Sequence, residues 1–580
     1  MTQEHSTGGS EGARMTSTDI NQTETEGKGL KSGALGLLGS VVVGVASTAP
    51  AYSLAASLGY VVVVANGNGI IGVKAPLIMI AAFIPMYFIA VAYAELNKAE
   101  PDCGTTFTWA ARAFGTRVGW MGGWGIIAAD VIVMANLAAI AGSYSFTLFG
   151  LDSLAASTFW STVAGVIWIV VMTYICYRGI EVSAKLQYAL LGFELVTLLA
   201  FTLFAFAKVF IGGTDAGHLM PSLSWLSPSG LSLSALSSGL LIAAFIYWGW
   251  DTAVTTNEEA DDPATTPGKA AILSTVFLLV TYALVSVATV AFAGVGTTGI
   301  GLGNEANADD VFAALGTEVF GGGFIGHLML ALLAFSVLTS ASASTQTTIL
   351  PTARTALSMG AFKAIPEKFA RVHPKYLTPM DSTIWMGVVS IVFYVGLTLL
   401  STNILGDTIA AVGLMIAFYY GLTGFACVWF YRKTMWSSTR NIIMQGLLPL
   451  LGGISLVGAF IMASYTYAAP DYGSFDIGGV GSVFLIGMGA LLTGAIIMVV
   501  YERVAPAYFR GETLPRREYG ELILHGAPGG IEHGGQRLPD SGPMPTVIAQ
   551  DLSNLPPGQV AVDPVTGREF TRPEGEGDTD

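Results

Sequence analysis

Long runs of hydrophobic residues fill the middle of the chain, and short polar segments separate them. A helix must contain about 20 mostly apolar residues to cross the hydrocarbon core of a bilayer. Runs of this kind lie at residues 33–64, 75–97, 118–147, 155–177, 186–211, 236–258, 269–294, 324–350, 383–402, 408–431, 441–466 and 478–501. The pattern predicts an all-α membrane protein with twelve transmembrane helices.

Basic residues are distributed unequally between the loops that join these runs. The loops after odd-numbered runs contain only Lys74 and Lys208. The loops after even-numbered runs contain Lys98, Arg112, Arg117, Arg178, Lys185, Lys269, Arg354, Lys363, Lys368, Arg371, Lys375, Arg432, Lys433 and Arg440. Short cytoplasmic loops collect Lys and Arg, so we expect a multi-pass protein of the cell membrane with both termini in the cytoplasm.

Composition agrees with a membrane location. The chain has 580 residues, of which 52% are hydrophobic and 11% charged, whereas soluble domains carry about 25% charged residues. Three scattered cysteines and six scattered histidines show no metal-ligand spacing, so we expect no metal site and no disulfide framework. The formal net charge is −14 and no basic block occurs, which argues against a nucleic-acid partner.

Polar segments flank the apolar region. Residues 1–31 are rich in Ser, Thr, Gly and Glu and lack the apolar core of a signal peptide. Residues 503–580 hold many Gly and Pro and end in EGEGDTD. We therefore expect a disordered cytoplasmic tail at residues 1–31, a twelve-helix domain at 32–502, and a second disordered cytoplasmic tail at 503–580.

Two of the predicted helices contain interruptions. The first includes GVASTAPAYS at residues 44–53, in which Pro50 breaks a regular helix. The sixth contains FIYWGWDTAVTTNEEADDP at residues 245–263, with the helix-weakening Gly249 followed by Asp251. Interrupted segments at matching positions of two halves point to a transporter with inverted repeats. The repeats would span about 33–211 and 236–431, with peripheral helices at about 441–501.

Several stretches, in this order and spacing, resemble the amino acid–polyamine–organocation (APC) permeases, of the actinobacterial amino acid permease type. They are GVASTAP in the first run, PDCGTTFTWAARAFG at 101–115, YRGIEVSAKLQ at 177–187, YWGWDTAVTTNEEADDPATTPGKA at 247–270, and TARTALSMGAFKAIPEKFARVHPKYLTPM at 352–380. The resemblance covers about residues 33–500. It implies a leucine-transporter-like fold with a 5+5 inverted repeat and broken helices 1 and 6.

The resemblance also implies a substrate site between the two breaks. The substrate carboxylate would meet backbone amides of the first break, here Ala46, Ser47, Thr48 and Ala49. Its ammonium would meet carbonyls of the sixth break, around Ile246, Tyr247, Trp248 and Gly249, with Tyr247, Trp248 and Trp250 closing over it. Residues near Ala129 and Val133 of the third span, and Phe335 and Thr339 of the eighth, would shape the pocket.

Three acidic residues lie within predicted spans, where ionisable groups are costly and usually functional. Asp251 either couples protons or binds a cationic group, or it caps the second half of the sixth helix. Glu194 stands in a span where some relatives have a lysine; it is a protonatable coupling group, a structural partner, or one turn away from that lysine position. Asp130 either lines the pocket or bonds to a neighbouring helix, through Asn136 or a serine.

Small and hydroxyl residues in the eighth span, SVLTSASASTQTTIL, suit close helix packing. The alternative is a sodium site built from Ser340, Ser344 or Thr345 with carbonyls of the first span, because hard cations prefer oxygen ligands. At the inner helix ends, acids near Glu258 and Glu259 would contact Lys269, Arg178 or Arg354 across a gate, and Glu95 would pair with inner-face cations.

These observations predict a secondary transporter that imports an amino acid by alternating access with the proton gradient. It would be no enzyme and would need no cofactor, although sodium is an alternative coupling ion. Its partners would be a small-molecule substrate and the lipid bilayer. Transport of an amine or polyamine, which lacks the carboxylate, and obligate amino acid exchange are the rival functions. The sequence shows no catalytic acid pair with a histidine, which argues against a membrane enzyme or sensor.

Overall fold

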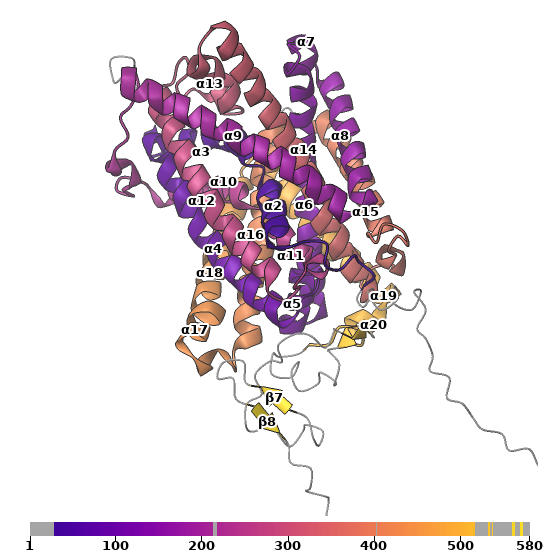
Figure 1. Cartoon of the computed structure of the whole chain (residues 1–580). Coiled ribbons are helices and arrows are strands. Elements are labelled where there is room, and N and C mark those ends of the chain that lie inside the picture. The colour runs from indigo at the N-terminus through magenta and orange to yellow at the C-terminus, as the bar shows by residue number, and fades with distance from the viewer. Residues whose placement is uncertain are drawn as a thin grey trace, which may run out of the picture.

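The computed structural model describes residues 28–212, 217–401 and 403–516, and four short strands beyond them. Within these residues, eleven helices are long and apolar enough to cross a membrane. Figure 1 shows most of them running lengthwise through one bundle, with α7 and α13 at one end and α5, α17 and α20 at the other. We call the second end the basic end, because it carries most of the Lys and Arg residues.

The observed helices match the predicted spans in order. They are α2–α3 (Leu37–Thr48 and Pro50–Val63), α4 (Ala75–Ala99), α6 (Thr116–Thr147), α8 (Thr158–Arg178), α9 (Ile180–Gly212), α10–α11 (Leu233–Tyr247 and Thr252–Thr255), α12 (Thr266–Ala293), α14 (Gly323–Ala361), α15 (Met380–Leu400), α16 (Ile404–Tyr431), α18 (Leu448–Tyr467) and α19 (Ser482–Val504).

The sixth span accounts for the difference between eleven long helices and twelve predicted ones. Its first part, α10, has 15 residues, which is too short to cross alone. An irregular segment and the four-residue α11 complete it. The first span is also divided, at Ala49, into α2 and α3. The prediction of broken helices 1 and 6 is therefore confirmed.

Contacts between helices repeat with an offset of five spans. In the first half, α9 (span 5) packs against the first, seventh and eighth spans, which are α2, α12 and α14. In the second half, α16 (span 10) packs against the sixth, second and third, which are α10, α4 and α6. The pairs α4–α12 and α6–α14 likewise join spans that lie five apart. This is the contact pattern of two structural repeats related by internal symmetry.

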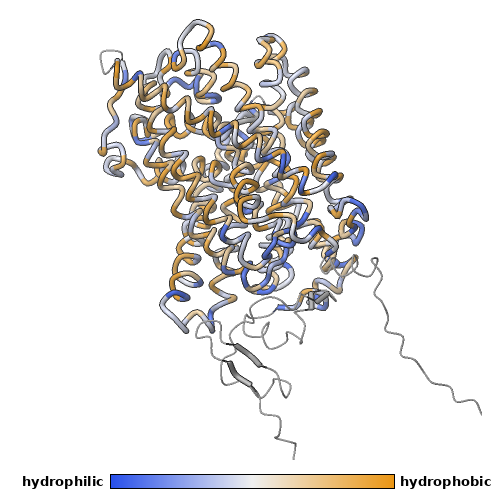
Figure 2. The backbone as a smooth tube through the Cα atoms, viewed as in Figure 1, coloured by the Kyte–Doolittle hydropathy of each residue, from blue (hydrophilic) through white to orange (hydrophobic). Residues whose placement is uncertain are grey.

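Hydrophobic residues cover the outside of the bundle. Figure 2 shows hydrophobic colour along the length of the peripheral helices, with hydrophilic residues gathered towards the helix ends and the basic end. In an 18-residue apolar stretch of α8, and in one of α19, only 22% of the residues are buried, whereas 89% are buried in the corresponding stretch of α2–α3. Side chains such as Val392, Leu399 and Leu492 are exposed. In a multi-pass membrane protein such residues face lipid.

Short elements connect the spans. They are α5 (Thr106–Phe114), α7 (Asp152–Ala155), α13 (Val311–Phe320), α17 (Thr439–Asn441), α20 (Pro506–Phe509), 3₁₀ turns η1 (Gly72–Lys74), η3 (Leu223–Leu226), η4 (Asn257–Glu259), η5 (Glu305–Asn307), η6 (Glu367–Ala370) and η7 (Met435–Ser437), and the π-helical turn η8 (Ile442–Leu447). The strands are β1 (Ala65–Asn66), β2 (Gly69–Ile70), β3 (Asp476–Ile477), β4 (Val480–Gly481), β5 (Glu532–His533), β6 (Gln536–Arg537), β7 (Val560–Val562) and β8 (Glu569–Thr571). Each strand has two or three residues and pairs only in a hairpin.

Packing extends beyond the predicted limits of the helical domain. Leu30, which the sequence assigned to a tail, is buried against Cys103 and Leu357. Tyr508 and Leu514 are also buried, against the basic ends of α6 and α14. Apolar side chains in these short stretches explain the difference, because composition averaged over a whole tail hides them. Residues 1–27 and 517–580 of the predicted tails lie outside the residues described, apart from the short strands.

Close helix packing at Gly142 leads to a testable prediction. A Cβ at Gly142 of α6 would collide with the carbonyl of Ser161 in α8, and a Cβ at Gly165 with the carbonyl of Ala138. Gly142→Leu should lower the thermal unfolding midpoint in detergent, because overpacking costs about 1–3 kcal/mol. Gly192→Leu is the matched control, since a Cβ at Gly192 would meet no heavy atom within 4 Å apart from the adjoining residues and backbone of its own helix. Equal midpoints for both variants would contradict the packing argument.

Candidate functional site

The first break lies at the junction of α2 and α3. Ala49 adopts a left-handed conformation with φ 46°, and Pro50 then starts α3. Proline suits this position because its missing N–H needs no partner there. Nearby polar groups are satisfied locally: the Thr48 hydroxyl donates to the Val45 carbonyl at 2.7 Å and Ser53 Oγ to the Thr48 carbonyl at 2.5 Å. The predicted contacts Ala46, Ser47, Thr48 and Ala49 are all buried here.

The sixth break separates α10 from α11. Trp248 is extended, and Gly249 has φ 117°, a conformation that L side chains rarely adopt. The Ile246 carbonyl accepts a hydrogen bond of 2.7 Å from the hydroxyl of Tyr282 in α12. Trp250 packs edge-on against Tyr93, with ring centroids 5.1 Å apart. All the predicted site residues from Ile246 to Asp251 are buried.

The two breaks touch each other. A hydrogen bond of 2.9 Å joins the hydroxyls of Ser47 and Thr252. A Cβ at Gly249 would lie 2.9 Å from the carbonyl carbon and oxygen of Ser47, so only glycine permits this approach. On the α14 side, Ser344 donates to the Ser47 carbonyl at 2.8 Å. The structure therefore brings together the two segments that the sequence predicted to face one another.

Asp251 stands at the N-cap position of α11, but its side chain makes no capping hydrogen bond. Instead, its Oδ2 accepts a hydrogen bond of 3.1 Å from the hydroxyl of Tyr419 in α16. The same hydroxyl accepts a hydrogen bond from Nε1 of Trp248. The cap alternative is thus not what the side chain does. The carboxylate is linked to an aromatic residue of the break through α16.

Glu194 reaches from α9 to the start of α3. Its Oε1 accepts the backbone N–H of Ala51 at 2.6 Å and the hydroxyl of Ser340 at 2.8 Å. The Ser340 oxygen in turn accepts the N–H of Tyr52 at 3.2 Å. The side chain is 1% exposed, and its Oε2 has no hydrogen-bond partner among the residues described. Each break therefore carries one buried carboxylate.

Some of the predicted pocket residues of the third and eighth spans lie in the buried core of the bundle, and one does not. Ala129 and Val133 of α6 belong to the same buried cluster as Ala49 and Trp248. The Thr339 hydroxyl donates to the Phe335 carbonyl of its own helix at 2.9 Å. Phe335 itself is 38% exposed and stacks edge-on with Phe193 at 5.0 Å. The structure therefore does not bring the Phe335 side chain to the breaks, because it lies on the outward face of α14.

The three sodium-site candidates differ in orientation. Ser344 contacts the Ser47 carbonyl, as expected for a site shared by α14 and the first span. Ser340 is bonded to Glu194. Thr345 turns back to its own helix and donates to the Ala341 carbonyl at 2.9 Å. Of the three candidates, Ser344 alone presents its hydroxyl to a carbonyl of the first span, because Glu194 takes the Ser340 hydroxyl and the Thr345 hydroxyl bonds within its own helix.

Asp130 makes an interhelical hydrogen bond. Its Oδ2 accepts from the hydroxyl of Thr352 in α14. Asn136, the partner considered from sequence, instead donates to Thr408 of α16 at 2.9 Å. The interpretation of Asp130 as a helix-to-helix contact is confirmed, with a threonine as partner.

Ion pairs join helices at the basic end of the bundle. Arg354 of α14 donates to both carboxylate oxygens of Glu259, from Nε at 2.5 Å and from a terminal nitrogen at 2.8 Å. Both residues are buried. This confirms one of the predicted gate contacts. Glu95 pairs with Arg440 at 2.6 Å, as expected.

An N-terminal strap, residues 28–36, crosses the same region. Lys28 Nζ lies 2.7 Å from Asp102 Oδ2 and 2.5 Å from Glu258 Oε1, and its side chain is 8% exposed. Burial alone would lower the pKa of Lys28, but the charges of Asp102 and Glu258 raise it well above its usual value. Burial raises the pKa of the neighbouring Cys103 thiol, and the positive charge of Lys28 acts in the opposite direction. The strap is therefore held by a charged contact as well as by Leu30.

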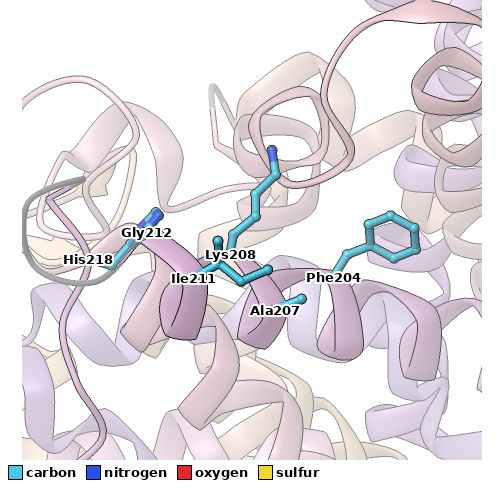
Figure 3. A pocket seen from close by; sticks show the side chains of 6 residues that line it. All are labelled: Phe204, Ala207, Lys208, Ile211, Gly212 and His218. Atoms are coloured by element: carbon cyan, nitrogen blue, oxygen red, sulfur yellow. The ribbon is translucent and has the colours of Figure 1, made fainter.

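Surface cavities lie away from the breaks. One, of about 330 Å³, is lined by Phe204, Ala207, Lys208, Ile211, Gly212 and His218 at the end of α9 (Figure 3). Another, of about 310 Å³, is lined mainly by apolar residues of α8 and α15. In the first cavity the Lys208 ammonium donates to the Glu318 carbonyl at 2.6 Å. Neither cavity contains a residue of the predicted site.

Comparison with known proteins assigns the chain to a family. The sequence profile described as amino acid permease matches residues 35–506. The chain belongs to the amino acid permease family. This permease is accordingly a transporter of the APC superfamily rather than an enzyme, and a multi-pass membrane protein with a small-molecule substrate.

Individual relatives are distant. An uncharacterized transporter of Mycobacterium tuberculosis (strain ATCC 25618 / H37Rv) is 26% identical over 361 residues, which cover 61% of the permease and 72% of the relative. The branched-chain amino acid permease BcaP of Lactococcus lactis is 24% identical, with 34% and 44% covered. The arginine/ornithine antiporter ArcD1 of the same organism is 25% identical, with 36% and 43% covered.

A solved structure supports the architecture. The crystal structure of MhsT in complex with L-phenylalanine aligns with a TM-score of 0.55 and 14% identity, covering 73% of the permease and 98% of MhsT. At this identity the likeness establishes the fold alone. It agrees with the leucine-transporter-like fold that the sequence resemblance implied and with the repeated helix contacts.

Several residues of the site were not found from sequence. Tyr419 and Tyr282 bond to the sixth break from distant helices. Lys28 was assigned to a tail. Tyrosines in apolar spans carry no distinctive pattern, because their hydroxyl partners are set by tertiary packing. Only the position of Tyr419 in span 10, which packs against span 6 in this fold, would have suggested it.

The close approach at Gly249 predicts the effect of a small substitution. Gly249→Ala should abolish transport, because the added Cβ meets the Ser47 backbone and the φ of 117° is strained for alanine. The measurement is substrate uptake into liposomes, with Gly192→Ala as the control for an added methyl group. Wild-type uptake by a correctly inserted Gly249→Ala protein would contradict this prediction, because it would show that transport does not need the close contact between Gly249 and the Ser47 backbone.

The strap predicts a change in the accessibility of Cys103. Lys28→Met, in a Cys176→Ser/Cys427→Ser background, should raise the rate of maleimide labelling several-fold by freeing the strap. Loss of the ammonium would on its own make the thiol less reactive, since Lys28 lowers the pKa of Cys103. Faster labelling of Cys103 would therefore show that the strap has left the thiol exposed. Lys31→Met removes an exposed ion pair with Glu181 and serves as the control; equal rates in the two variants would count against the strap.

Proposed function

We propose that this permease imports an amino acid across the cytoplasmic membrane together with protons, by alternating access around the two breaks. The observation that carries the proposal is the presence of one buried carboxylate at each break, in a chain of the amino acid permease family. Protonation of Glu194 or Asp251 would bias the conformational equilibrium, since a ligand shifts states only through differential affinity. The proton gradient would supply the driving force, with no cofactor.

The substrate would lie between the breaks. Its carboxylate would use backbone amides of Ala46 to Ala49, and its ammonium the carbonyls near Ile246 and Trp248. Tyr247, Trp248 and Trp250 would close over it, and Ala129, Val133 and Thr339 would shape the side-chain pocket. The basic-loop asymmetry supports a location of both termini in the cytoplasm.

Transport of a cationic amine is a second candidate, favoured by the buried carboxylates of Asp130, Glu194 and Asp251. A carboxyl-free substrate would not need the amides of the first break. Exchange is a variant of either function, and the likeness to an arginine/ornithine antiporter supports it. Sodium coupling would use Ser344 with the Ser47 carbonyl.

The decisive experiment is a transport screen in liposomes that contain a pH-sensitive dye. We expect one class among the twenty amino acids to cause internal acidification without sodium, and one of the two variants Glu194→Gln and Asp251→Asn to reduce it at least tenfold. Asp407→Asn is the control: this buried carboxylate bonds to Ser401 and Ser474 at the other end of α16 and should leave proton entry intact.

The alternative functions give different results in the same screen. Acidification by amines alone would identify an amine transporter. Uptake of label that requires preloaded substrate would indicate exchange, and uptake that requires sodium would indicate sodium coupling. In either case Asp251 would be a structural or substrate contact.

A further inference from the structure

The N-terminus of α3 is already occupied by an acidic side chain. α3 has 14 residues and begins with Pro50, which has no N–H. Glu194 accepts the next N–H, that of Ala51, and holds Tyr52 N–H through Ser340. The exposed amides and the helix dipole make such a terminus attractive to anions. Glu194 therefore stands at the part of the first break that best attracts a carboxylate.

The second carboxylate oxygen of Glu194 is unused. Oε2 is buried and has no hydrogen-bond partner among the described residues. An unpaired buried acceptor is costly, and an uncompensated buried charge more so. Oε1 of Glu194 therefore accepts two hydrogen bonds, from the Ala51 N–H and the Ser340 hydroxyl, whereas Oε2 is available to a proton.

Few ionisable groups face this carboxylate. α12 presents Tyr282, which interacts electrostatically with Glu194; α3 carries Tyr52, whose backbone N–H bonds to Ser340 and whose hydroxyl is unpartnered among the described residues. α2 has no ionisable side chain. The other described ionisable groups of α9 and its neighbours stand at other turns of their helices: Glu181, Lys185, Tyr188 and Lys208 on α9, Tyr60 on α3, Tyr174, Cys176, Tyr177 and Arg178 on α8, Lys269 on α12, Glu318 on α13, and His327 and Arg354 on α14. The charge of Glu194 is thus compensated by dipoles rather than by a cation.

We infer that Glu194 and the substrate carboxylate compete for the N-terminus of α3, so that a carboxylate binds there only when Glu194 carries a proton. Two negative charges at one half-helix end repel each other strongly in a low-dielectric site. The inference rests on the proposed function and deepens it. The proton adds to Oε2 from the outer solution, enters with the substrate and leaves to the inner side.

Linkage gives this mechanism a quantitative signature. If proton and carboxylate must bind together, each raises the affinity of the site for the other by the same factor. Above the pH at which Glu194 ionises, the apparent Kd of an amino acid should rise about tenfold per pH unit, as expected for one linked proton. An amine without a carboxylate does not compete with Glu194, so its Kd should not rise with pH.

The test measures binding to the purified full-length permease in detergent, where no gradient is needed. The probes are two matched pairs, leucine with 3-methylbutylamine and arginine with agmatine, together with the amino acid that acidifies liposomes most strongly and its methyl ester. We expect affinity for the free amino acid to weaken with rising pH, and affinity for the carboxyl-free probe to stay constant or strengthen. Equal pH slopes within the pairs would overturn the inference.

Variants locate the effect. Glu194→Gln mimics the protonated state, so it should bind the amino acid at all pH values with less than a twofold change, exchange it, and fail to accumulate it. Asp407→Asn should keep the wild-type slope. A wild-type slope in Glu194→Gln would also overturn the inference. If Glu194→Gln does not fold, the probe pairs on the wild-type protein decide alone.

The two levels of proposal fail separately. Absence of substrate-driven proton entry into liposomes would refute proton symport, whatever the binding slopes. Proton entry together with a pH-independent amino acid Kd would leave symport standing and refute the role of Glu194.

Discussion

Backbone polar groups inside a membrane must find partners within the protein, and the two unwound segments are the place where this constraint is hardest to meet. Side chains from other helices meet it here. Ser344 of α14 bonds to the Ser47 carbonyl, Tyr282 of α12 to the Ile246 carbonyl, and Glu194 of α9 to the Ala51 amide. The breaks are therefore tied to the helices around them. Any movement at the breaks must exchange these hydrogen bonds, and a substrate with a carboxylate and an ammonium carries the groups that can replace them.

The internal symmetry extends to the chemistry of the site. Span 5 supplies Glu194 to the break of span 1, and span 10 supplies Tyr419 to the break of span 6. Spans 5 and 10 occupy equivalent positions in the two repeats, but the charges are placed differently. In the first repeat the acid lies on the supporting helix, and in the second Asp251 lies on the broken helix itself. Each break thus has one carboxylate nearby, but the two acids come from non-equivalent positions and lie in unlike surroundings, which favours unlike roles.

The sequence predicted the parts of the structure that depend on local chemistry. Apolar runs marked the spans, Pro50 and Gly249 marked the breaks, and the spacing of the breaks indicated the repeats. It failed where side chains choose among distant partners. Periodicity in a helix that is apolar on all faces does not define an inner face, which is why Phe335 was placed in the pocket although it stacks on Phe193. Lys28 was assigned to a tail for a similar reason: its carboxylate partners come from segments about 74 and 230 residues away.

The chain around α2 contacts the chain around α11 both at the breaks and at the basic end. At the breaks, Ser47 of α2 bonds to Thr252 of α11. At the basic end, Ala34 and Leu35 N–H groups bond to the Glu259 carbonyl, and Asp261 N–H bonds to the Leu35 carbonyl. The segments that contain α2 and α11 are thus joined at both ends, while Tyr52 of α3 contacts Phe245 of α10 on the other side of the breaks. Under the proposed alternating access, opening the basic end would separate Glu259 from Arg354 of α14, and separating a buried ion pair without new partners costs about 3–5 kcal/mol. Water would therefore enter as the pair opens, so hydration of Arg354 and Glu259 would be part of the proposed transition.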